Sequence, residues 1–132
     1  MVLVDSSVVI DFLKNAENAQ TIKLDNLINK NIPFGINPNI YQEVLQGVAT
    51  EKEFKLVKEY LDSQRFYYLK HGNESYATAA MMYFKCRKKG VTVSSTIDLI
   101  IALTAIENSL FLLHNDNDYN KIQSVFPDLI FY

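Results

Sequence analysis

The 132-residue chain is long enough for one compact domain and too short for two of ordinary size. Hydrophobic residues make up 48% and charged residues 21% of the chain, which excludes a disordered or collagen-like protein. With 13 Lys and Arg against 15 Asp and Glu, the net charge is -2, so binding of nucleic acid would need a local basic patch or metal ions.

The first part of the chain alternates short apolar runs with helical patterns. In chain order, we expect a buried strand at residues 2–4, a helix from Ser6 or Ser7 to Leu13, a helix at 18–30, a short strand at 32–36 and a helix from Pro38 to about Gly47. Asn37 followed by Pro38 is typical of a helix start, because proline lacks an N–H that the first turn would leave unpaired.

The remaining chain continues this alternation. We expect a helix at residues 51–62, a strand at 66–69, a helix at 74–89 followed by Gly90, a helix at 96–108, a strand at 110–113 and a last strand at 129–131. The helix at 51–62 is amphipathic through Phe54, Val57, Tyr60 and Leu61. Residues 1–132 therefore predict a single α/β domain, a sandwich around a mostly parallel sheet of four or five strands.

Three features bear on the cellular compartment. The lone cysteine, Cys86, excludes an internal disulfide and a multi-cysteine metal site, and a chain without disulfides is expected in the reducing cytoplasm. The start Met-Val-Leu-Val-Asp has no basic segment, so we expect no signal peptide. The longest apolar stretch, between Asp98 and Glu107, is too short to span a bilayer, so we expect no membrane partner.

Carboxylates at the ends of the predicted strands are the most informative feature. Asp5 and Asp116 each follow a strand, and Asp98 opens the most apolar helix. Glu43 borders the apolar face of its own helix. In open parallel sheets, ligands bind beyond the carboxyl ends of the strands, so we expect these side chains to converge there.

Convergent carboxylates repel one another unless a cation or protons compensate them. Mg²⁺ prefers oxygen ligands and keeps several waters, and such an ion can activate water against a phosphodiester. The sequence therefore favours metal-dependent hydrolysis, which needs no His, Cys or Ser nucleophile.

Each carboxylate also has a purely structural interpretation. Asp5 can cap the first helix, and Ser95 with Asp98 fits a capping box. Glu43 can be a solvated helix residue, while Asp116 and Asp118 can be turn residues. The combination is more informative than any member, because these placements would have to coincide at one end of one sheet.

Four segments resemble the signature blocks of PIN-domain ribonucleases, in the family's order and near its spacing. They are Val-Leu-Val-Asp-Ser-Ser-Val-Val-Ile from residue 2, Glu-Val-Leu from 43, Thr-Ile-Asp-Leu-Ile-Ile-Ala from 96 and Leu-Leu-His-Asn-Asp-Asn-Asp-Tyr from 112. The chain is most similar to the VapC-type toxins of toxin–antitoxin pairs. The resemblance covers almost the whole chain and implies the PIN fold and a Mg²⁺- or Mn²⁺-dependent endoribonuclease.

The resemblance also assigns roles to residues. It implies that Asp5 and Asp98 are the principal metal ligands and that Glu43 is the second acidic position. Asp116 or Asp118 would supply the fourth acid and could complete the metal site; the sequence leaves open which of the two serves.

The resemblance also implies a role for one small polar residue, the partners of the protein and the products of the reaction. Ser6 matches a small polar position near the metal. A cognate antitoxin and a homodimer are implied partners, and 5′-phosphate and 3′-hydroxyl ends are implied products.

A basic cluster, Lys85, Arg87, Lys88 and Lys89, lies at the end of the helix at 74–89. It either complements the helix dipole or contacts RNA phosphates beside the metal site.

Two other function classes compete with the ribonuclease. An aspartyl-phosphate phosphatase would use Asp5, but that chemistry usually wants a second Asp two residues on, where this chain has Ser7. The second competing class is a catalytically inactive module that binds protein or RNA. A ribonuclease acting in RNA processing, outside a toxin–antitoxin pair, is also compatible with the sequence.

Overall fold

A single parallel sheet organises the chain, and the computed structural model describes all 132 residues. The strands are β1 (Val2–Val4), β2 (Gly35–Ile36), β3 (Arg65–Phe66), β4 (Phe111–Leu113) and β5 (Ile130–Phe131). Their order in the sheet is β3-β2-β1-β4-β5, and every neighbouring pair is parallel. The expected α/β sandwich is confirmed, with five strands.

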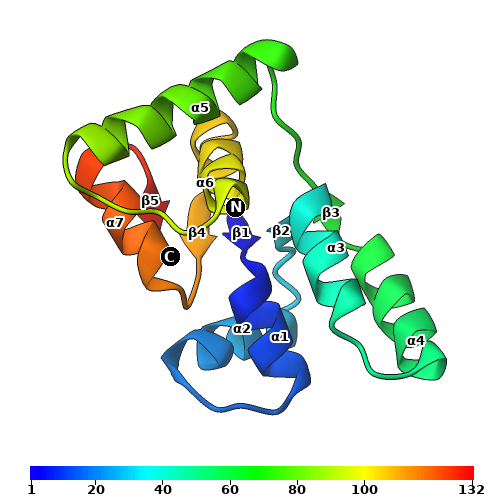
Figure 1. The fold of residues 1–132 in the computed structure, drawn as a ribbon. Helices are drawn as coiled ribbons and strands as arrows, with labels where there is room; N and C mark the ends of the chain where they lie inside the picture. The colour runs from blue at the N-terminus through cyan, green and yellow to red at the C-terminus, as the bar shows by residue number, and fades with distance from the viewer.

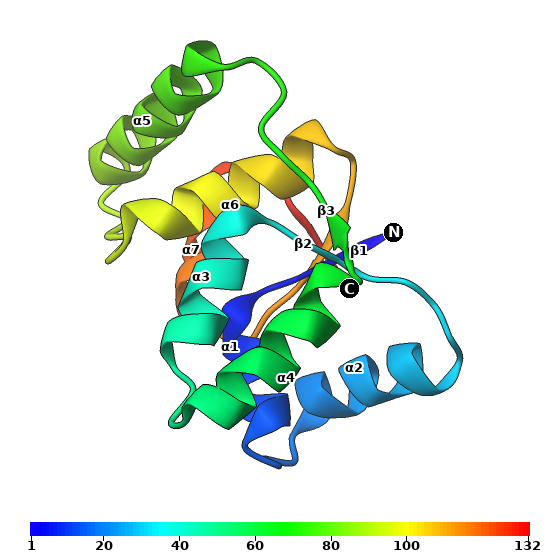
Figure 2. The same ribbon diagram turned by 90° about the vertical axis from the view of Figure 1, so that its right-hand side faces the viewer.

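Seven helices connect and cover the strands. They are α1 (Ser6–Leu13), α2 (Ala19–Asn29), α3 (Pro38–Gln46), α4 (Glu51–Asp62), α5 (Asn73–Lys88), α6 (Thr96–Glu107) and α7 (Asn117–Val125). In Figures 1 and 2, α5 and α6 lie on one side of the sheet, and α2 and α4 lie on the other. None of the helices combines the length and apolar content that a membrane span requires.

The strand order places a topological switch between β1 and β4. From β1 the chain moves outward to β2 and β3, and it then crosses to the other side of β1 to form β4 and β5. Loops that leave two adjacent strands in opposite directions open a crevice at their carboxyl ends. Asp5 follows β1 and Asp116 follows β4, so both lie at this switch.

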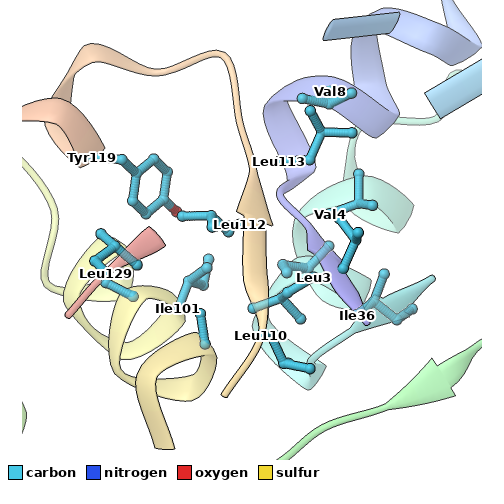
Figure 3. Close-up of a cluster of buried hydrophobic side chains, with 14 of the residues drawn as sticks. Leu3, Val4, Val8, Ile36, Ile101, Leu110, Leu112, Leu113, Tyr119 and Leu129 are labelled. Atoms are coloured by element: carbon cyan, nitrogen blue, oxygen red, sulfur yellow. The ribbon is translucent and has the colours of Figure 1, made fainter. Parts of the chain in front are cut away.

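The core lies around β1, β4 and α6. Leu3, Leu112 and Ile101 are fully buried there, and Figure 3 shows their side chains packed together. Since α6 buries side chains around most of its circumference, it has the all-round apolar composition of an interior helix. The rigid placement of α6 fixes Asp98 in its first turn.

Most predicted elements are present, but β2 and β3 are shorter than expected. The strands expected at 32–36 and 66–69 shrink to two residues each, at Gly35–Ile36 and Arg65–Phe66. Asn37 caps α3 and Pro38 is its first residue, as predicted. Gly90 follows α5 with φ +73°, a left-handed conformation that suits glycine.

Two sequence-based expectations are incomplete. The patterns predict no element over residues 117–125, but α7 forms there, because Asp116 caps it and Tyr119 and Ile122 bury one face. The apolar face expected for α4 is only partly covered: Leu61 is fully buried, whereas Phe54 and Tyr60 are each 41% exposed.

Because α4 is buried mainly at Leu61, two leucines of this helix should differ in how much they contribute to stability. Leu61→Ala should lower the free energy of unfolding by about 2–5 kcal/mol, because Leu61 is fully buried. Leu56→Ala should change it by less than about 0.5 kcal/mol, because Leu56 is 61% exposed. Urea denaturation followed by circular dichroism measures both, and equal losses would contradict the packing of α4.

Candidate metal centre

Five carboxylates from distant parts of the chain gather at the switch between β1 and β4. Asp5 follows β1 and caps α1, while Asp116 follows β4 and caps α7. Asp98 and Asp118 lie in the first turns of α6 and α7. Glu43 approaches from α3 and comes close enough to Asp5 and Asp116 for their charges to act on it.

Three of these carboxylates form a tight group. One carboxylate oxygen each from Asp98, Asp116 and Asp118 lies within 4.8 Å of the other two. Asp5 adjoins the group through Tyr119, whose hydroxyl donates to Asp5 Oδ1 at 2.7 Å and lies 3.5 Å from Asp98 Oδ1. The expected convergence of Asp5 and Asp98 on one region of the molecule is therefore present in the structure.

Asp5 is held rigidly by three donors. Its Oδ2 accepts hydrogen bonds from the Ser7 backbone N–H at 3.0 Å and from Ser7 Oγ at 2.6 Å. Tyr119 supplies the third donor, and its side chain is fully buried. Asp5 is 3% exposed, so these bonds replace most of its hydration. Its capping of α1 and its place in the acidic cluster coexist.

Asp118 differs from the other carboxylates of the cluster because an ion pair joins the hydrogen bonds that compensate its charge. Ser94 donates to Asp118 Oδ2 from both its hydroxyl and its backbone N–H, and Lys121 Nζ lies 3.4 Å from Oδ1. The Ser94 hydroxyl is the main cause of a lowered Asp118 pKa. Asp118 therefore stays ionised, and its hydrogen bonds to Ser94 link α7 to the segment just before α6.

Asp98 has the least compensation in the cluster. Burial is the main cause that raises its pKa to about 7, and the negative charges of Asp116, Asp5, Asp118 and Glu43 raise it further. The capping-box interpretation of Asp98 is not realised, because Ser95 caps α6 through the Ile97 N–H. Near neutral pH the proton on Asp98 is consequently held more strongly than on a solvated aspartate, unless a cation joins the cluster.

Glu43 presents an unpartnered polar atom to the same region. Its Oε1 is buried and has no hydrogen-bond partner. Burial and then the charge of Asp5 raise the Glu43 pKa, and the Ser6 hydroxyl opposes that rise. Glu43 is therefore only partly solvated, and Ser6, which is 7% exposed, lies close enough for its hydroxyl to act on this carboxylate.

These observations test whether a divalent cation suits the site. The donors are all hard oxygens, which Mg²⁺ and Mn²⁺ accept. Only one ion pair within the protein, that of Lys121 with Asp118, offsets the five carboxylates. An orphaned buried carboxylate oxygen is costly, and a cation with its bound waters would supply partners for it. The residues present therefore fit such an ion.

The expected basic residues lie at the C-terminal end of α5. The cations Lys85, Arg87 and Lys88 are exposed in the last turn of α5, and Lys89 caps its end. The Arg87 guanidinium lies 5.8 Å from the centre of the Tyr83 ring. The basic cluster thus complements the dipole of α5 and also remains open to ligands.

The structure also shows supporting residues that the sequence patterns did not single out. Ser94 and Ser7 each bind a carboxylate of the cluster, and Tyr119 joins two of them. His114 Nδ1 accepts a hydrogen bond from the Asp116 N–H, which fixes the loop after β4. Ser7 and Tyr119 adjoin conspicuous acids in the sequence, but no local signal connects Ser94 with Asp118, 24 residues away.

An all-parallel sheet with acids gathered at its switch point is typical of α/β domains that bind ligands beyond the carboxyl ends of the strands. The chain belongs to the PIN domain family, whose model matches residues 2–125. PIN domains are nucleases, and the resemblance seen in the four sequence blocks is thereby confirmed at the level of the family.

Solved structures share this fold over the full length of the chain. One is the VapBC2 complex from Rickettsia felis bound to a DNA fragment from its promoter, with a TM-score of 0.72, 19% identity, and coverage of 100% of this chain and 98% of that one. FitAcB from Neisseria gonorrhoeae is similar with a TM-score of 0.69, 19% identity, and coverage of 100% and 97%.

A complex named FitAB, bound to an IR36 DNA fragment, matches with a TM-score of 0.70 and 17% identity, covering 100% of this chain and 94% of that one. No curated protein sequence matches the chain.

The electrostatic state of the cluster predicts that removing one charge stabilises the metal-free protein. In EDTA at pH 8, Asp98→Asn should raise the free energy of unfolding by about 1–2 kcal/mol, since each unit of pKa shift corresponds to about 1.4 kcal/mol and partial exposure reduces the effect.

The sign of the pH dependence follows from the raised pKa. Folded Asp98 binds its proton up to about pH 7, whereas the unfolded chain loses it near pH 4. The parent therefore loses stability relative to the variant as pH rises from 4 to above 7. Thermal unfolding across this range measures the difference. Asp128→Asn, at an exposed position, is the control, and a constant gap would contradict the electrostatic explanation.

Proposed function

We propose that the chain is a metal-dependent endoribonuclease and the toxin of a VapBC-type toxin–antitoxin pair. The observation that carries the proposal is the group formed by Asp98, Asp116 and Asp118, whose oxygens lie within 4.8 Å of one another at the switch point of the sheet. Mg²⁺ is the expected ion, with Mn²⁺ as a substitute. The substrate is an RNA phosphodiester.

The metal would be held by Asp98, Asp116 and Asp118, with Asp5 beside them. The same four residues, together with Glu43, form the catalytic set. When bound, the ion supplies charge neutralisation on the phosphodiester and a more acidic water. Both Asp116 and Asp118 belong to the proposed site, with Asp118 the more firmly oriented because Ser94 and Lys121 hold it.

Glu43 is the residue suited to move a proton. Its raised pKa lies closer to neutral pH than that of a solvated carboxylate, which improves a general base. Its buried Oε1 is free of protein partners and can accept a proton from water. The Ser6 hydroxyl favours the ionised form of this carboxylate, while Ser7 and Tyr119 hold Asp5 in place through hydrogen bonds.

Assignment to a toxin–antitoxin pair is supported by the family and by the shared fold with VapBC2 and FitAB. We infer a cognate antitoxin partner, a homodimer and a cytoplasmic location. The basic cluster on α5 is a proposed contact for RNA phosphates, since Lys85, Arg87 and Lys88 are exposed in a chain of net negative charge. A small upstream reading frame with a DNA-binding pattern would identify the antitoxin.

Metal dependence can be tested with purified protein and single-stranded RNA. Cleavage should require Mg²⁺, stop in EDTA and return with excess Mg²⁺. Asp98→Asn should lower kcat/KM at least about 100-fold and weaken Mg²⁺ or Mn²⁺ binding in calorimetry, because one ligand of the site is lost. Asp128→Asn is the matched control and should cleave like the parent.

The outcomes separate the competing functions. Unchanged cleavage by Asp98→Asn would show that the site assignment is wrong. Turnover of a phosphate monoester with inert RNA would indicate the phosphatase. Absence of both metal binding and cleavage in the parent would indicate an inactive binding module.

The proposed role of Glu43 predicts a separation of binding from catalysis. Glu43→Gln should keep metal affinity within a few-fold and lower kcat by about 10²–10⁴-fold, because the amide cannot accept the proton. In the parent, kcat should rise with pH as Glu43 ionises, whereas the residual activity of the variant should lack this rise. Calorimetry and a pH series of initial rates test this, and an equal loss of metal affinity would make Glu43 a ligand instead.

A further inference from the structure

An open cavity adjoins the acidic cluster at Asp116. It has a volume of about 540 Å³ and lies between the first half of α2 and the start of α7, with Asp116 on its boundary. Its size falls within the range of small-molecule sites. No role assigned above to the carboxylates involves this space.

Side-chain amides dominate the polar lining of the cavity. Gln20 lines it from α2, and Asn117 and Asn120 line it from α7. Asn120 Nδ2 donates to Asn117 Oδ1 at 3.2 Å, which leaves Asn120 Oδ1 and Asn117 Nδ2 available to a ligand. Neighbouring donors and acceptors of this kind match the edge of a nucleobase, which presents both.

Aromatic rings and one cation complete the cavity. Phe131 of β5 and Tyr132 just after it line the cavity, and the centre of the Phe131 ring lies 4.3 Å from that of the His114 ring. Lys23 Nζ donates to the Tyr132 carbonyl at 2.9 Å, which ties α2 to the end of β5 and holds the ammonium group at the cavity. Aromatic faces stack on bases, and an ammonium group attracts the adjoining phosphate.

We propose that this cavity is a nucleobase subsite, which receives the base of a ribonucleotide next to the phosphodiester at the acidic cluster. The inference rests on the proposed nuclease function, and it adds a source of sequence preference. Asp116 belongs to both sites, so a ribonucleotide with its base among the amides has its phosphate next to the carboxylate cluster. An acidic peptide fits less well, because Asp116 repels carboxylates and the amides give them too few donors.

The subsite can be tested without a metal ion and without cleavage. Isotope-labelled parent protein in EDTA is titrated with adenosine, guanosine, cytidine and uridine, and with ribose as the sugar without a base. At least one nucleoside should shift the side-chain amide signals of Gln20, Asn117 and Asn120, and ribose should not.

Two variants and one control make the assignment specific. Asn120→Ala and Gln20→Ala should each weaken the binding of that nucleoside about fivefold, the loss expected for one hydrogen bond of about 1 kcal/mol. Asn26→Ala, at an exposed position of α2, should bind like the parent. Equal binding by all variants, shifts produced equally by ribose, or shifts confined to α5 would overturn the subsite.

Failure of the subsite is distinguishable from failure of the proposed function. RNA cleavage without nucleoside shifts at the cavity would leave the nuclease assignment standing and remove the subsite. Nucleoside binding at the cavity in a chain that does not cleave RNA would support the base-binding cavity and remove the nuclease assignment.

Discussion

Mutual repulsion among carboxylates is the constraint on which the site depends. Four aspartates and Glu43 meet at the carboxyl ends of the strands, where hydrogen-bond donors, Lys121 and the positive ends of helices offset part of their charge. Asp5 and Asp116 cap α1 and α7, while Asp98 lies in the first turn of α6. Each helix N-terminus stabilises a nearby anion by about 0.3–1 kcal/mol, so several termini reduce the repulsion without removing it. The remaining repulsion adds to burial, the larger cause, in raising the pKa of Asp98.

Capping and metal binding are compatible uses of the same residues. Asp5 Oδ2 accepts both hydrogen bonds from Ser7, and Asp5 Oδ1 accepts one from the Tyr119 hydroxyl, which also lies near Asp98. Asp116 likewise uses Oδ1 to accept the Asp118 N–H at the start of α7. A carboxylate that accepts one cap bond retains further lone pairs. The capping interpretation of Asp5 is therefore confirmed, and Asp116, expected as a turn residue, caps α7; neither cap weighs against a proposed role as a ligand.

Local sequence signals predict the parts of this fold that local physics controls. Short apolar runs mark β1 and β4, and Asn37 with Pro38 marks the start of α3, because strand burial and helix starts depend on adjacent residues. The helix α7 is not predicted because most of its residues are polar, and its buried apolar residues are only Tyr119 and Ile122. These two side chains are buried by packing against the rest of the domain, which a local sequence pattern does not contain.

The finer architecture of the site depends on contacts across long sequence separations. Tyr119 and Asp5 are 114 residues apart, and Ser94 and Asp118 are 24 apart. No local pattern encodes such pairs, so the sequence indicates which acids converge but not what orients them. Tyr119 shows why the orientation matters: its hydroxyl has one proton and lies near both Asp5 and Asp98. Donation to Asp5 at 2.7 Å leaves Asp98 the less compensated of the two, which is consistent with the raised pKa of Asp98 and makes it the carboxylate that gains most from a cation.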